Sequence, residues 1–205
     1  MRKMIKFLAV MFLAWGVSSV SATAEELGPK EVVEHAVNGI VDVLKERANP
    51  EVLTEVDRQA IREQVEGRFD YHEMARRSVG RIWNKQSTPL QDDFTSVFRD
   101  LLEYTYGNRL SAYKNQTVEF DDAEFKRNKA RVKTNVVDGS KKTPVWYRLH
   151  QKDHHWMVYD IKIEGVSLVG TFRKDFKSSL HRDGFESLLH ALKEKVSKMK
   201  AKDAA

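Results

Sequence analysis

The stretch of chain between residues 116 and 164 constrains the fold most, because four strand-like segments follow one another there with only short turns between them. Each segment is rich in Val, Ile, Tyr, Phe, Trp and Thr, the residue types that favour strands. The segments are 116–124, 129–137, 143–151 and 155–164. Consecutive strands joined by short turns predict an antiparallel meander, because parallel strands need a long crossover connection.

The alternation within these segments predicts which side chains share a face of the sheet. In the third segment, one face carries Val145, Tyr147 and Leu149. In the fourth, one face carries Met157, Tyr159, Ile161 and Ile163, and the other carries Trp156 and Val158. Apolar groups on both faces predict a sheet covered by helices, or a sheet whose second face lines a cavity.

Helical patterns precede and follow the strand-like segments. The expected starts before the sheet are Pro29, Asn49-Pro50, Asp70 (a helix ended by Gly80) and Thr88-Pro89 (a long helix to Tyr113). After the sheet, Ser167 is placed to cap a helix, and a second amphipathic helix follows. We expect the last ten residues, which are rich in Lys, to fray. The order of elements predicts one α+β domain.

The first 24 residues have the pattern of a secretory signal peptide. Arg2, Lys3 and Lys6 precede an apolar run, and Ala22-Thr23-Ala24 fits the small-x-small cleavage pattern. The apolar run is too short for a comfortable membrane anchor. We therefore expect cleavage after Ala24, export to the periplasm, and a single mature domain over residues 25–205.

The charge balance does not favour a nucleic-acid-binding protein. The net charge of +5 includes three positive charges in the signal peptide, so the mature chain carries only +2. Much of that remaining charge lies in the C-terminal tail instead of on one binding element.

Familiar catalytic patterns are missing from the sequence. There is no Cys, no HExxH pattern and no Gly-x-Ser-x-Gly elbow. The adjacent His154 and His155 would point to opposite faces of a strand, and we predict no metal site. Asp160, on the last strand, is either a general base or, more in keeping with such positions, a carboxylate paired with an Arg or a backbone donor.

A series of motifs along the mature chain resembles the MlaC family, whose members are also described as toluene-tolerance or ABC-transporter auxiliary proteins. The most specific piece is the strand Trp156-Met157-Val158-Tyr159-Asp160-Ile161 with the following Glu164-Gly165-Val166-Ser167-Leu168-Val169. Earlier pieces include Phe69-Asp70, Val79-Gly80 and Tyr106-Gly107, and the resemblance extends to Leu192.

The resemblance implies an NTF2-like fold, in which a curved four-stranded antiparallel sheet is wrapped by helices around an apolar pocket. It also implies a monomeric, non-enzymatic carrier of phospholipid in the periplasm, with lipid as cargo and no cofactor. Its partners would be an inner-membrane ABC transporter with an MCE-domain ring and an outer-membrane lipoprotein associated with a porin. The carrier would approach each membrane only transiently.

We place the expected pocket between the sheet and the segments 69–83, 88–113 and 166–180. The predicted lining residues are Trp83, Phe98, Leu102, Tyr106, Tyr147, Leu149, Val166 and Val169. A Val166→Trp change is then expected to reduce bound lipid. Head-group or partner contacts are assigned to Arg76, Arg77, Arg81 and Arg173, with solvated surface charge as the alternative.

Two other functions fit the sequence. One is an NTF2-like isomerase or hydratase that uses Asp160 as general base, which predicts a polar pocket around that carboxylate. The other is an envelope interaction module without a ligand, which predicts a filled core and no cavity.

Overall fold

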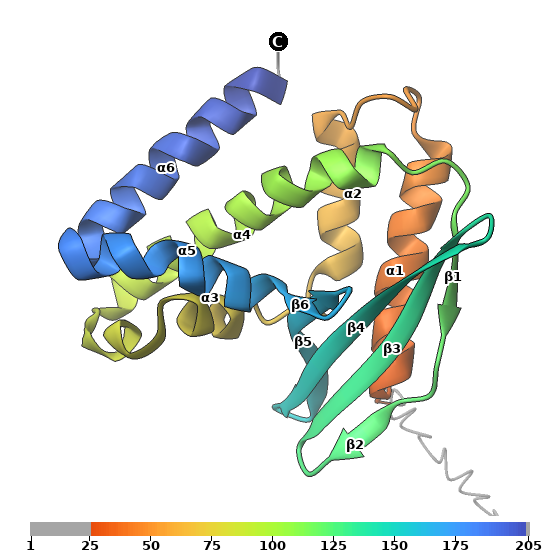
Figure 1. The fold of residues 1–205 in the computed structure, drawn as a ribbon, viewed down its shortest axis with the longest axis horizontal. Helices are drawn as coiled ribbons and strands as arrows, with labels where there is room; N and C mark the ends of the chain where they lie inside the picture. Colours follow the sequence, from red (N-terminus) through yellow and green to blue (C-terminus); the bar gives the residue numbers. More distant parts are fainter. Residues whose placement is uncertain (1–25, 204–205) are drawn as a thin grey trace, which may run out of the picture.

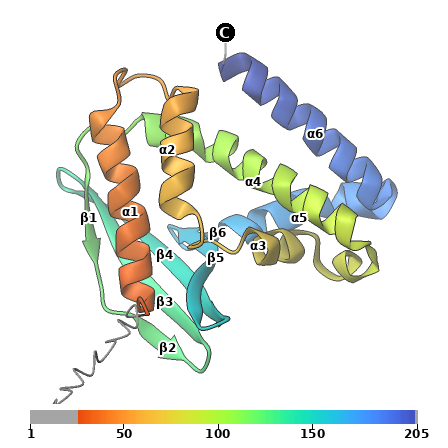
Figure 2. The ribbon, with the colours of Figure 1, turned by 180° about the vertical axis from the view of Figure 1, so that it is seen from behind.

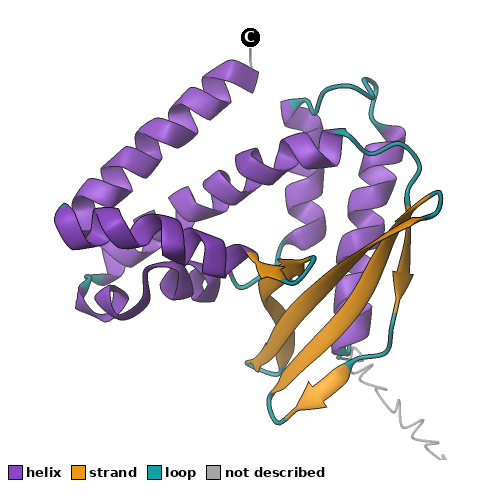
Figure 3. Cartoon of the chain, in the orientation of Figure 1, coloured by secondary structure: helices purple, strands orange, loops and turns teal. Residues whose placement is uncertain are grey.

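The computed structural model describes residues 26–203, which form an α+β fold of helices and one antiparallel sheet (Figures 1 and 3). In chain order the elements are α1 (Pro29–Glu46), α2 (Glu55–Val65), α3 (Tyr71–Val79), the 3₁₀ helix η1 (Gly80–Lys85), α4 (Thr88–Ser111), β1 (Thr117–Phe120), β2 (Glu124–Lys126), β3 (Lys129–Asp138), β4 (Lys141–Lys152), β5 (His155–Ile163), β6 (Val166–Ser167), α5 (Leu168–Arg182) and α6 (Gly184–Asp203). The expected signal peptide, residues 1–24, lies outside the described residues.

The sheet is an antiparallel meander as expected, but it has six strands and not four. The order is β1-β3-β4-β5-β6, and β2 also pairs with β3. The segment predicted as one strand over 116–124 bends after Phe120, where the Asp121 N–H donates to the Lys133 carbonyl. Its two parts therefore pair with successive lengths of β3. The short strand β6 was not expected, and it forms after a turn at Gly165 with φ of 82°.

A bulge in β5 changes which side chains face inward. Arg148 pairs with Asp160 and Leu149 pairs with Val158, so Tyr159 is an extra residue on β5. The predicted alternation along this strand is therefore wrong at the bulge. Val158 and Ile161 lie on the same face, against α1, while Tyr159 contacts the Arg77 side chain of α3.

The described residues form three apolar cores, the smallest of which contains Leu44, Leu53 and Ile61 between α1 and α2. Helix α1 covers one face of the sheet, with α2 beside it (Figure 2), and Val32 and Val33 pack there against Val132 and other strand residues. The second core lies among α3, η1, α4, α5 and α6. It is built around rings in mutual contact, those of Trp83, Phe94, Phe98, Phe172, Phe176 and Phe185.

The helix boundaries follow the caps, with three differences from the predictions. Helix α2 begins at Glu55 and not at Pro50, because Thr54 and Asp57 form a reciprocal capping box. Helix α4 begins at Thr88, with Ser87 in the N-cap position. The last ten residues are not frayed in the described range, since α6 continues to Asp203. The caps at Asp70 and Ser167, and the helix end at Gly80, are as predicted.

Candidate functional site

An apolar cavity of about 330 Å³ lies between the sheet and helices α1, α2 and α4. Val37 and Ile40 of α1 form one side, and Tyr147 and Ile161 of β4 and β5 form the opposite side. Leu102 and its neighbours on α4 contribute a third side. The walls come from elements that are distant in the sequence, and their apolar faces leave a space that the side chains do not fill.

A second hollow of about 470 Å³ adjoins the first. The two share Val37, Ile40, Val136 and Tyr147 among their walls. Its wall also includes polar side chains from the end of α4, the segment before β1 and the adjoining ends of β3 and β4, namely Arg109, Gln116, Asp138, Lys141 and Thr143. The arrangement is an apolar space with a polar rim, as suits a molecule with an apolar body and a polar end.

Two tyrosine hydroxyls at the cavity wall remain neutral across the physiological range. Burial raises the pKa of Tyr147 to about 12. For Tyr71 the main effect is again burial, and its pKa is also about 12. The wall therefore carries no phenolate charge.

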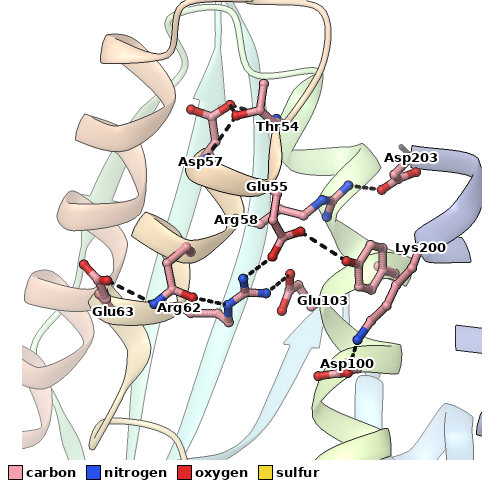
Figure 4. A network of polar contacts seen from close by, with 12 residues as sticks. Thr54, Glu55, Asp57, Arg58, Arg62, Glu63, Asp100, Glu103, Lys200 and Asp203 are labelled. Carbon is pink, nitrogen blue, oxygen red and sulfur yellow. Dashed lines mark hydrogen bonds and ion pairs between the residues drawn. The ribbon is translucent and has the colours of Figure 1, made fainter. Parts of the chain in front are cut away.

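Charged side chains reach the cavity mainly from α2 and α4, and most of them are paired. Arg62 Nη1 donates to Glu103 Oε1 at 2.7 Å, and Arg62 also pairs with Glu55 (Figure 4). Burial raises the pKa of Glu103, although Arg62 acts in the opposite direction. The Arg58 guanidinium pairs with Asp203 at the end of α6.

Three of the eight predicted lining residues line this cavity: Leu102, Tyr106 and Tyr147. Trp83, Phe98 and Val169 instead belong to the helical core, where ring packing fills the space. Leu149 is 0 % exposed in the core between α1 and the sheet. Val166 is 61 % exposed on β6, so our expectation that Val166→Trp would obstruct a pocket is corrected.

The four arginines assigned to head-group or partner contacts do not line the cavity. Arg76 and Arg77 pair with Glu73, one helical turn away. Burial pushes the pKa of Glu73 upward, but the two guanidinium groups outweigh it and lower the pKa to about 2. Arg81 and Arg173 lie together at a surface hollow between η1 and α5. Contact with a head group or a partner stays a prediction for all four.

Asp160 serves the fold in this structure. Its carboxylate is 3 % exposed and accepts hydrogen bonds from the Ser167 hydroxyl at 2.9 Å and from the Val169 N–H at 3.3 Å. Arg148 lies 3.5 Å away. Asp160 thus supports the start of α5 and does not line the cavity.

Several wall residues were not predicted from the sequence. Ala36, Ile61 and Val65 line the cavity from α1 and α2. The spacing of Ile61 and Val65 marks an apolar face on an otherwise polar helix, which was the available signal. Between residues 26 and 203, no cluster of three His, Cys, Asp or Glu side chains is arranged to hold a metal ion.

Together, the α+β fold and the apolar cavity define a class of domain with an internal apolar space suited to an apolar group. The chain belongs to the MlaC family, because the family model described as "MlaC protein" matches residues 34–194.

The chain is also similar to curated proteins of two bacteria. It is 22 % identical over 125 residues to the intermembrane phospholipid transport system binding protein MlaC of Haemophilus influenzae. It is 29 % identical over 105 residues to the toluene tolerance protein ttg2D of Pseudomonas putida. These matches span 58 % and 50 % of this chain and 58 % and 49 % of the two relatives.

A solved structure shares the fold. It is that of the phospholipid-binding protein from Ralstonia solanacearum in complex with a phospholipid, with a TM-score of 0.78 and 22 % sequence identity. The match covers 85 % of this chain and 99 % of that one. Within residues 26–203, no helix is both long and apolar enough to cross a bilayer.

Proposed function

We propose that this protein is a non-enzymatic carrier of phospholipid in the periplasm. The observation that carries the proposal is the apolar cavity between α1, α2, α4 and the sheet, which opens to a hollow with a polar rim. Membership of the MlaC family, and the similarity to proteins that bind phospholipid, support the same conclusion. The curved sheet wrapped by helices supports an NTF2-like classification of the fold.

The energetics explain why such a carrier needs an apolar cavity and little else. Two acyl chains contain about 30 methylenes, and each gains about 0.8 kcal/mol on leaving water. The gross gain is about 24 kcal/mol, but a bilayer offers nearly the same. Lipid can therefore move in either direction when the protein meets a membrane complex, and the net preference stays small.

The proposed partners are those of the family: an inner-membrane ABC transporter with an MCE-domain ring, and an outer-membrane lipoprotein associated with a porin. We propose that the protein is a monomer between these encounters and touches each membrane only transiently. No nucleotide is needed on this chain, because any ATP hydrolysis would take place on the transporter.

Lipid mass spectrometry of an organic-solvent extract tests the proposal. The purified protein is expected to carry phospholipid in stoichiometric amount. A gently purified, folded sample that contains no lipid, and takes up none from vesicles, would refute it. An isomerase based on Asp160 finds no support in the cavity, since that carboxylate is outside it and bonded to α5.

A further inference from the structure

The last two turns of α6 are tied to both α2 and α4. Asp203 pairs with Arg58 of α2, and Lys200 Nζ lies 2.7 Å from Asp100 Oδ2 of α4 (Figure 4). The Lys200 ammonium also lies 5.7 Å from the centre of the Tyr104 ring. The C-terminal end of the helix therefore spans the line along which α2 and α4 meet, which we call the α2–α4 seam.

Arg58 connects this helix end to the cavity, because it belongs to the cavity wall. Its side chain is 3 % exposed, and its guanidinium stacks over Tyr104 at 4.6 Å. The group fits because position 107 is Gly: a Cβ there would come within 2.3 Å of Arg58 Nη1. A movement of Asp203 would thus be felt directly at the cavity wall.

The seam is held by side chains more than by close packing of helix backbones. Helix α2 packs on α1, and α4 packs on α6, but α2 and α4 meet chiefly through Arg62–Glu103, the hydrogen bond from the Tyr104 hydroxyl to Glu55, and Arg58 over the Tyr104 ring. Two buried atoms in the seam, Arg58 Nη1 and Glu103 Oε2, have no hydrogen-bond partner among the described residues. Such unpartnered polar atoms disfavour the closed seam, because opening would hydrate them.

The position of the seam gives opening a purpose. Arg58, Arg62 and Glu103, which meet at the seam, all belong to the cavity wall. Opening of the seam would therefore give acyl chains a path into the cavity.

We propose that residues 195–203 form a clamp on the α2–α4 seam that limits the uptake of acyl chains. Arg58–Asp203 and Lys200–Asp100 hold the seam closed, and their release lets α2 move from α4 and widen the cavity. These residues follow position 194, where the match to the family model ends. The inference rests on the proposed function, since it concerns how the same cavity is loaded with phospholipid.

Reversal of one charge in the full-length protein tests the clamp. Asp203→Lys places a cation next to Arg58 and so breaks the ion pair. Lipid-free protein is mixed with vesicles of phosphatidylethanolamine and phosphatidylglycerol that contain a fluorescent phospholipid, and the rate of lipid uptake by the protein is measured. Uptake is expected to be at least about threefold faster than in the wild type, the range of one ion pair. Lys193→Glu is the matched control, because it reverses a 2.5 Å pair between α6 and Asp93 of α4 that does not reach α2.

A covalent version of the clamp decides the question if Asp203→Lys does not fold. The chain has no Cys, so Arg58→Cys with Asp203→Cys provides a unique site for a short bis-maleimide linker. Linked protein is expected to take up lipid at least about threefold more slowly than the same protein unlinked. Uptake that is equal in both forms overturns the clamp alone, whereas a wild type that takes up no phospholipid overturns the proposed function and the clamp with it.

Discussion

Replacement of Val136 by Trp is the most direct test of where the acyl chains lie. Val136, on β3, is half-buried and forms part of the wall of both hollows. The larger side chain adds about 100 Å³, or about three water volumes, at the junction between them. The substitution therefore removes the space of about three methylenes where the two hollows share a wall.

The loss of space converts into a loss of bound lipid. About three methylenes would be excluded, and at about 0.8 kcal/mol each the protein loses about 2–3 kcal/mol relative to the bilayer. The equilibrium between protein and vesicle should then shift by roughly 30- to 150-fold toward the vesicle. The assay incubates protein with excess vesicles, separates the two by sedimentation, and measures phospholipid in the protein fraction by mass spectrometry.

The same substitution at Val166 is the control. Val166 is 61 % exposed on β6, so Val166→Trp adds the same ring without entering the cavity, and lipid occupancy should stay at the wild-type level. Circular dichroism and urea unfolding must show that both variants are folded. A folded Val136→Trp protein with wild-type lipid occupancy would refute the placement of the chains in this cavity.

Other substitutions separate structural from functional roles. Asp160→Asn should lower the free energy of unfolding by about 1–2 kcal/mol in urea titrations, because the Ser167 hydroxyl loses a charged acceptor. Lipid occupancy should stay unchanged, and lost occupancy in a folded variant would contradict this structural role. Arg76 and Arg77 lower the pKa of Glu73 from 4.5 to about 2. The contribution of the Glu73 ion pairs to the free energy of unfolding is therefore fully present above pH 4.5 and is lost as the pH falls toward 2. Glu73→Gln should therefore flatten the acid limb of the stability curve, and an unchanged limb would argue against the ion pairs. Gly80→Ala should destabilise the protein by about 1–3 kcal/mol, measured by its urea midpoint, because φ is 70° there.

The local structure of the helices could be predicted well because it depends on nearby residues. Asp70 and Ser167 cap helices as expected, since a cap needs only its own side chain and the next N–H groups. The start of α2 was misplaced because two cap patterns compete over residues 49–57. The structure selects Thr54, and Arg47 binds the Pro50 carbonyl and so holds the preceding segment as a loop.

The cavity walls could be predicted only in part, because apolar spacing does not distinguish a filled core from an empty space. Phe98 and Leu102 are one turn apart on α4, yet Phe98 packs among other rings and Leu102 reaches the cavity. The difference depends on which helices lie opposite each residue. Nothing within α4 itself carries that information.

One extra residue in β5 determines which side chains of that strand face α1 and the cavity. With strict alternation, Tyr159 would share the inner face with Ile161, and a bulky phenol would occupy the space at the sheet. The bulge turns Tyr159 away from α1, to a buried position beneath the Arg77 side chain, and leaves Val158 and Ile161 on the face toward α1. Asp160 needs no bulge to leave the inner face, because it is adjacent to Ile161 and points to the opposite side of the strand. There its carboxylate accepts hydrogen bonds from the Ser167 hydroxyl and the Val169 N–H at the start of α5. The bulge therefore accounts for Val158 and Ile161 sharing the inner face, and ordinary alternation accounts for the structural role of Asp160.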